Sequence, residues 1–159
     1  VKASKFIDKI IIATSTDSTD DPLEEVANKL GIECYRGSLN NIMERVYNAA
    51  KYYNCDNIVE LLGDNPLVHS ELIDDVISFY INGKYDYAAT VTKEYPVSDK
   101  KFCLFSVGVR VQVYSIDAAR RYSEYLEYMG NDVKGSTAYI FEHPEAFKIG
   151  YFEAKDKWG

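Results

Sequence analysis

Residues 9–14 read KIIIAT, and the polar stretch STDSTDD follows at residues 15–21. A continuous apolar run of this length, rich in isoleucine, is typical of a β-strand that is buried on both faces. A helix is predicted over residues 22–30, because Pro22 suits its first position and Gly31 suits its end. Asp20 or Asp21 is expected to cap it. This part of the chain therefore predicts one complete β–α unit.

The same alternation continues along the first half of the chain. Further strands are expected at residues 32–35, 58–62 and 85–92, with helices from residue 40 or 41 to 53 and from 70 to 83, the second capped by Ser70. The order β-α-β-α-β-α-β predicts right-handed crossovers and a mostly parallel sheet. The fold class expected is therefore α/β with helices on both faces of the sheet.

The second half of the chain has a less regular pattern. It predicts a charged loop over residues 93–101, a strand over 102–114, a helix over 116–129 capped by Ser115, a loop over 130–135, a helix over 136–143 and a strand over 147–152. Nothing in its composition resembles a linker between domains. Residues 1–159 are therefore expected to form a single domain.

The charge balance excludes some classes of protein. The chain has 18 Lys and Arg against 25 Asp and Glu, a net charge of -7, whereas a nonspecific nucleic-acid coat or a basic membrane patch needs excess positive charge. The longest apolar runs are too short to span a bilayer. The three cysteines form no CxxC pair, which predicts free thiols and a cytoplasmic protein.

Candidate site residues lie in the loops after the first three strands, because open α/β sheets bind ligands at the carboxyl ends of their strands. The third of these loops reads Gly63-Asp64-Asn65-Pro66. A carboxylate there suits Mg²⁺, which takes phosphate oxygens and water as its other ligands. The alternative is that Asp64 only fixes the turn or caps a helix.

The two earlier loops offer cations and carboxylates. Arg36 has a planar fork of donors that suits a base edge or a phosphate, and the helix that follows favours an anion at its N-terminus. The alternative to a ligand-binding role is that Arg36 is simply exposed and that the helix N-terminus is only capped. Arg45 lies on the same helix, and its alternative is an ion pair with Glu44 or Glu25. The acidic loop over residues 15–21 is better explained by caps and turns than by a cation site.

A family resemblance rests on several strings in a fixed order. They are DKIIIATS at residues 8–15, DDPL at 20–23, YRGS at 35–38, ERVYNAA at 44–50, and GDNPL at 63–67 with ID at 73–74. Together they resemble the cytidylyltransferases that activate sugars, namely the acylneuraminate and spore-coat polysaccharide biosynthesis cytidylyltransferases. Residues 100–152 match the same family more loosely.

The resemblance implies a nucleotidyltransferase of the glycosyltransferase-A-like fold. In the implied reaction a sugar hydroxyl attacks the α-phosphorus of CTP, pyrophosphate leaves and a CMP-sugar forms. The resemblance also implies roles for individual residues. It makes Asp64 the catalytic residue, which binds Mg²⁺, and it makes Asn41 and Asn65 residues that bind the sugar. The residues that it implies for binding the nucleotide are Ala13, Thr14, Ser15, Arg36, Ser38 and Arg45.

The resemblance is partial at both ends. The family's opening strand and its phosphate-gripping loop have no counterpart in these residues, and its second metal-binding aspartate would follow Gly159. Residues 93–143 are expected to form a homodimer contact. Two alternatives stay open: a guanylyltransferase or other nucleotidyltransferase, and a non-catalytic module that binds sugar nucleotides or forms oligomers.

Overall fold

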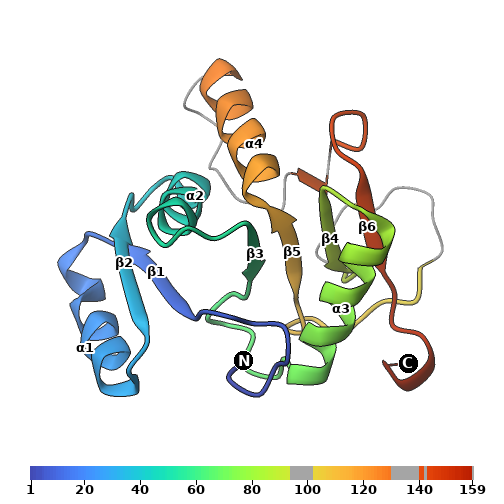
Figure 1. Cartoon of the computed structure of the whole chain (residues 1–159), viewed down its shortest axis with the longest axis horizontal. Helices are drawn as coiled ribbons and strands as arrows, with labels where there is room; N and C mark the ends of the chain where they lie inside the picture. Colours follow the sequence, from blue (N-terminus) through green and yellow to red (C-terminus); the bar gives the residue numbers. More distant parts are fainter. Residues whose placement is uncertain (94–101, 130–139, 142, 159) are drawn as a thin grey trace.

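The computed structural model describes residues 1–93, 102–129, 140–141 and 143–158 (Figure 1). The elements run in the order β1 (Ile11–Ser15), η1 (Ser18–Asp20), α1 (Asp21–Leu30), β2 (Glu33–Gly37), α2 (Ile42–Tyr52), β3 (Asn57–Glu60), α3 (Ser70–Gly83), β4 (Tyr87–Thr90), β5 (Gln112–Ser115), α4 (Ile116–Met129), β6 (Ile149–Phe152) and η3 (Asp156–Trp158). The predicted alternation of strands and helices is confirmed. None of the helices in the described ranges is long and apolar enough to cross a membrane.

The strands form two separate hydrogen-bonded sheets. β1 pairs with β2 in parallel, and the larger sheet has the order β3-β5-β4-β6. In the larger sheet β5 runs antiparallel to both β3 and β4, while β6 runs parallel to β4. β3, β4 and β6 therefore share one direction, as the sequence predicts, and β5 is the antiparallel exception. Within the described residues no ladder joins β1 to β3.

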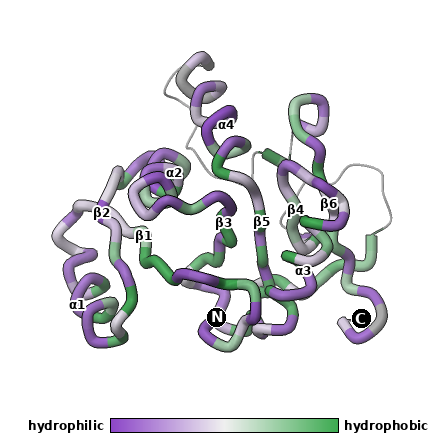
Figure 2. Tube along the Cα trace, viewed as in Figure 1, coloured by the Kyte–Doolittle hydropathy of each residue, from purple (hydrophilic) through white to green (hydrophobic). Residues whose placement is uncertain are grey.

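Helices cover both faces of the larger sheet (Figure 1). One core lies under α2 and α4 and includes Met43, Tyr87, Tyr114 and Tyr122. The other lies under α3, where Leu72, Ile73, Val76 and Ile77 pack against the opposite face. Along α4 the hydrophobic stretch lies at the end that meets β5 (Figure 2). Burial of these two apolar layers is the main stabilisation of the domain.

The prediction of a long strand over residues 102–114 is wrong in its first part. Only residues Gln112–Ser115 form a strand, and Gly108 adopts a positive φ of 87° in the preceding turn. Thr90 interrupts the ladder here: its hydroxyl donates to the carbonyl of Val109 and accepts from the amide of Val111. The alternating valines therefore reflect a buried approach to the sheet and not one continuous strand.

Several predicted boundaries and caps also change. Strands predicted at residues 9–14, 32–35, 58–62, 85–92 and 147–152 are observed as β1, β2, β3, β4 and β6, offset or shorter at their ends. α3 is capped by His69, whose side chain accepts from the amide of Glu71, and not by Ser70. Asp20 precedes α1 but makes no side-chain cap there, because its carboxylate binds the loop behind it. Asn41, Ser115 and Gly31 occupy their predicted places.

Part of the predicted second half lies outside the described residues. This concerns the loop over residues 94–101, the loop over 130–135 and most of the helix over 136–143. Of that helix, residues 140–141 form a short 3-10 turn. Ile140 and Phe141 are both buried against the α2/α4 side of the sheet.

Candidate functional site

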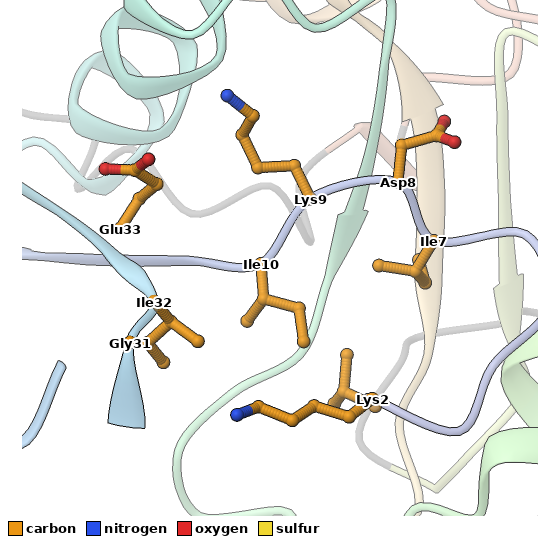
Figure 3. Close-up of a pocket in the computed structure, with 9 residues that line it drawn as sticks. Lys2, Ile7, Asp8, Lys9, Ile10, Gly31, Ile32 and Glu33 are labelled. Atoms are coloured by element: carbon orange, nitrogen blue, oxygen red, sulfur yellow. The ribbon is translucent and has the colours of Figure 1, made fainter. Parts of the chain in front are cut away.

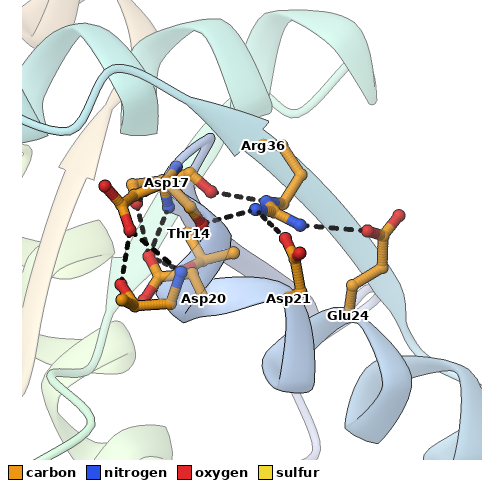
Figure 4. A network of polar contacts seen from close by, with 8 residues as sticks. Thr14, Asp17, Asp20, Asp21, Glu24 and Arg36 are labelled. Atoms are coloured by element: carbon orange, nitrogen blue, oxygen red, sulfur yellow. Dashed lines mark hydrogen bonds and ion pairs between the residues drawn. The ribbon is translucent and has the colours of Figure 1, made fainter.

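The loop after β1 is folded around the carboxylate of Asp20 (Figure 4). One oxygen of Asp20 accepts from the Thr14 hydroxyl at 2.7 Å, the Ser15 hydroxyl at 2.6 Å and the Ser15 amide at 2.9 Å. These hydrogen bonds, from Ser15 and then Thr14, lower the pKa of Asp20 to about 2. Thr14 and Ser15 are both buried, so this end of β1 is fixed from inside the loop.

The other acidic residues of this loop also act as caps and partners, as the sequence predicts. Asp17 accepts from the amide and the hydroxyl of Thr19 and so caps η1. The hydrogen bonds from Thr19 lower the pKa of Asp17. Asp21, at the start of α1, forms an ion pair with Arg36 at 2.8 Å. The three carboxylates are therefore accounted for by the local structure.

Arg36 lies on β2, directly opposite Thr14 in the parallel ladder. Its guanidinium forms ion pairs with Asp21 at 2.8 Å and Glu24 at 3.1 Å, both in the first turn of α1. It also donates to the carbonyls of Ser15 and Asp17. The predicted nucleotide residue Arg36 is therefore surrounded by partners from the loop after β1 (Figure 4).

The loop after β2 is built around Ser38. The Ser38 hydroxyl accepts from the amide of Asn41 at 3.1 Å, and the Asn41 side chain caps α2 by accepting from the amide of Glu44 at 3.0 Å. Arg45, one turn into α2, donates to the carbonyl of Ser38 at 2.6 Å. Ser38, Asn41 and Arg45 are thus brought together by hydrogen bonds in one loop and the first turn of α2.

Arg45 differs from Arg36 in its surroundings. Within the described residues Arg45 pairs with no carboxylate, so the predicted alternative of an ion pair with Glu44 or Glu25 is wrong; Glu25 instead lies 3.8 Å from Lys29. The Nε of Arg45 is enclosed and has no hydrogen-bond partner. Its aliphatic stem lies over Gly37, where an added Cβ would come within 3.0 Å of Cγ.

Asp64 lies in the loop after β3, exposed to solvent. Its Oδ1 accepts from the side-chain amide of Asn65 at 2.9 Å, and the turn itself is closed by the Asn65 amide and the Leu62 carbonyl at 3.1 Å. The Asp64 carboxylate caps no backbone amide in the described part of the chain, so the alternative of a turn-fixing or capping aspartate is not what the structure has.

No group of three or more His, Cys, Asp or Glu in the described ranges is arranged to hold a metal ion. A single exposed carboxylate such as that of Asp64 fits Mg²⁺ that arrives with a nucleotide, since Mg²⁺ is commonly bound by one or two carboxylates together with phosphate oxygens and water. Its free, exposed oxygen is available for that contact. A resident metal held by protein ligands alone does not fit these residues.

The predicted residues fall into two groups. Ala13, Thr14, Ser15 and Arg36 lie at the ends of β1 and β2, with the Ser38–Asn41–Arg45 group in the loop that follows. Asp64 and Asn65 follow β3 in the other sheet. Within the described residues, no hydrogen bond or ion pair links them to the first group.

A cavity lies at the opposite ends of β1 and β2. A cavity of about 440 Å³ lies between the N-terminal segment and the starts of β1 and β2, lined by Ile7, Ile10 and Ile32 with Lys2, Lys9 and Glu33 (Figure 3). The predicted residues Ser15 and Arg36 lie at the opposite ends of these strands. A second cavity of about 390 Å³, lined by residues including Leu67 and His69, lies beside the loop that carries Asp64.

A buried polar group in the larger sheet was not selected from the sequence. Tyr114 donates to Glu60 at 2.8 Å, and Gln112 accepts from both Tyr87 and Arg110. All five residues are buried. In the sequence, Arg110 and Gln112 alternate with valines, but this alternation does not distinguish a buried polar face of a strand from an exposed one.

The arrangement is that of an α/β nucleotidyltransferase fold, with polar loops at the ends of parallel strands. A family model described as cytidylyltransferase matches residues 1–153. The chain therefore belongs to the cytidylyltransferase family, and the resemblance inferred from the sequence is confirmed.

Proteins similar to this chain include the following three. It is 36% identical to an uncharacterized protein of Methanocaldococcus jannaschii over 155 residues, which is 96% of this chain and 58% of that protein. It is 26% identical to the spore coat polysaccharide biosynthesis protein SpsF of Bacillus subtilis over 151 residues, covering 95% of this chain and 58% of SpsF. A cytidylyltransferase structure from Leptospira borgpetersenii matches with a TM-score of 0.77 at 26% identity, covering 96% of this chain and 60% of that one. The chain thus spans less than two thirds of the length of these relatives.

Proposed function

We propose that this chain is part of an enzyme that transfers CMP from CTP to a sugar, in the synthesis of a polysaccharide or glycoconjugate. The observation that carries the proposal is the cytidylyltransferase family match over residues 1–153. The name of the SpsF relative supports a role in polysaccharide synthesis. The acceptor we propose is an acylneuraminate-like or related sugar, as the sequence resemblance implies.

The proposed reaction joins a sugar hydroxyl oxygen to the α-phosphorus of CTP. The bond from that phosphorus to the bridging oxygen of the β-phosphate breaks, pyrophosphate leaves, and the hydroxyl proton is released. A protein accelerates such a transfer by aligning the two substrates and by neutralising the negative charge that develops on the phosphate oxygens. No covalent protein intermediate is required.

Specific residues supply these functions in the proposal. The ends of β1 and β2, with Ala13, Thr14, Ser15 and Arg36, and the α2 loop, with Ser38 and Arg45, form the nucleotide side. Asn41 and Asn65 face the sugar. Asp64 binds the Mg²⁺ that accompanies the triphosphate, because its carboxylate is exposed and caps no backbone amide. Mg²⁺ supplies charge neutralisation at the phosphates.

We also propose a cytoplasmic homodimer. The three cysteines are free, which suits a reducing compartment. Tyr125 and Tyr128 on α4 leave 39% and 88% of their surface exposed, and such aromatic residues are common in protein interfaces. Light scattering of the purified chain tests this directly, and a monomeric mass at micromolar concentration would contradict the dimer.

The first test of function is thermal unfolding with CTP, ATP, GTP or UTP, each with and without Mg²⁺. A ligand that binds only the folded state raises the melting temperature. We expect a rise with CTP that is larger when Mg²⁺ is present. A rise with GTP alone would favour a guanylyltransferase, and no rise with any nucleotide would show that these residues hold no nucleotide site of their own.

The second test concerns Asp64. Asp64→Ala is expected to remove the extra stabilisation that Mg²⁺ adds to CTP, while CTP without metal binds as before. Asp56→Ala, an exposed aspartate just before β3, is the matched control and should behave as wild type. An unchanged Mg²⁺ response in Asp64→Ala would mean that another group binds the metal.

A further inference from the structure

Two arginines lie in the segment assigned to the nucleotide, and the structure gives them opposite surroundings. Arg36 is on β2 and Arg45 is on α2. Both could present a guanidinium to a phosphate or a base. What distinguishes them is how much of each guanidinium is already committed to the protein.

Each nitrogen of the Arg36 guanidinium is engaged by the protein. Its Nη1 donates to Glu24 at 3.1 Å, its Nη2 donates to Asp21 at 2.8 Å and to the carbonyl of Asp17 at 2.8 Å, and its Nε donates to the carbonyl of Ser15. All three nitrogens therefore have partners. The two carboxylates neutralise its charge, and hydrogen bonding to Asp21 and Glu24 raises the pKa of Arg36 despite partial burial.

The partners of Arg36 all belong to one loop and the helix turn that follows it. Arg36, on β2, donates to the carbonyls of Ser15 and Asp17. Asp20, within the loop, accepts from the hydroxyls of Thr14 and Ser15. The loop is thus fixed on both sides without a ligand. A loop fixed in this way can present its remaining backbone groups to a substrate with little loss of entropy on binding.

Arg45 has the opposite character. Among the described residues, the one hydrogen bond of its guanidinium is from Nη1 to the carbonyl of Ser38 at 2.6 Å. Its Nε is enclosed without a hydrogen-bond partner, and Arg45 forms no ion pair with a carboxylate of the described residues. The residue as a whole is only half-buried, so its guanidinium is open to a ligand, and an anion bound there would supply the partner that the enclosed Nε lacks.

We infer that the two arginines have separate roles: Arg36 is a positioning residue that holds the loop after β1, and Arg45 contacts the anionic part of the nucleotide. The inference rests on the proposed function in naming CTP as the ligand. The role of Arg36, in contrast, concerns the folded loop and is testable without any nucleotide.

The first experiment measures CTP affinity at several salt concentrations. Arg45→Met removes a contact cation, so we expect the Kd for CTP to rise about tenfold and its dependence on salt to become weaker. Lys51→Met, at the other end of α2, makes the same change in net charge and should leave both close to wild type.

The second experiment needs no ligand. In hydrogen exchange of the free chain, Arg36→Met is expected to speed exchange of the amides at residues 15–20 at least tenfold, while Arg45→Met leaves them unchanged. Slow exchange there in Arg36→Met would overturn the positioning role. If wild type binds CTP and Arg45→Met binds it as Lys51→Met does, the contact role is overturned. If wild type does not bind CTP, the proposed function fails, and the contact role of Arg45 fails with it. The role of Arg36 is then decided by hydrogen exchange alone.

Discussion

Asp74 and Asp75, neighbours on α3, hold opposite ends of the chain. Asp74 accepts from the backbone amide of Lys5 at 3.0 Å, whereas Asp75 accepts from the indole of Trp158 at 2.9 Å and lies 2.9 Å from the ammonium of Lys157. Partial burial acts to raise the pKa of Asp75, and the bonds from Lys157 and Trp158 outweigh it, so the pKa is lowered. One helix turn therefore fixes two segments that are distant in sequence.

This arrangement can be monitored by fluorescence, because Trp158 is the single tryptophan. Asp75→Ala is expected to shift its emission to longer wavelength, since the indole loses its partner and becomes more exposed, and to cost about 1 kcal/mol of stability. Asp74→Ala is the matched control, with emission as in wild type. Identical emission from wild type and Asp75→Ala would contradict the contact.

The loop after β1 should depend on pH through Asp20. Its folded-state pKa of about 2 lies below the ordinary 3.8, so the ionised carboxylate stabilises the fold above about pH 4, and this contribution is lost as the pH falls through 2. In thermal unfolding measured from pH 5 to pH 2, the melting temperature of wild type should exceed that of Asp20→Asn at pH 5, and this difference should shrink as the pH falls. A difference between the two proteins that stays constant down to pH 2 would refute the lowered pKa.

Gly150 on β6 leaves room for the ring of Tyr85. An added Cβ would lie 2.6 Å from Tyr85 and 2.8 Å from Phe79, so Gly150→Ala should destabilise the protein by about 1–3 kcal/mol through overpacking. Gly63, with no atom within 4 Å of an added Cβ, is the control, and Gly63→Ala should be nearly neutral. Denaturant unfolding measures both. Equal stability of the two variants would mean that Tyr85 moves aside freely.

The Tyr114–Glu60 hydrogen bond joins β5 to β3 inside the sheet. Tyr114→Phe removes the buried hydroxyl that donates to the Glu60 carboxylate, and we expect the free energy of unfolding to fall by about 1–3 kcal/mol. Tyr128→Phe changes a ring that is 88% exposed and should stay within about 0.5 kcal/mol of wild type. A Tyr114→Phe variant as stable as Tyr128→Phe would show that the buried bond adds nothing.

The elements with strong local signals were predicted well. Pro22 and Gly31 mark the ends of α1 through their backbone preferences, and Asn41 marks the start of α2 through its capping side chain. The strand ahead of β5 was over-extended, because alternating valines indicate burial but not hydrogen bonding, and Thr90 and Gly108 redirect the backbone there. The antiparallel direction of β5 depends on its partners and has no local signature.

By itself the sequence determined the α/β class, the order of its units and the family, because apolar periodicity, caps and short motifs are local properties of the chain. Only the tertiary structure decided which partners each polar group has. Arg36 and Arg45 look alike in sequence, yet one meets Asp21 and Glu24 and the other meets no acid of the described residues. The reason is that parallel pairing of β1 with β2 brings the start of α1 beside Arg36, and such long-range proximity sets charge compensation.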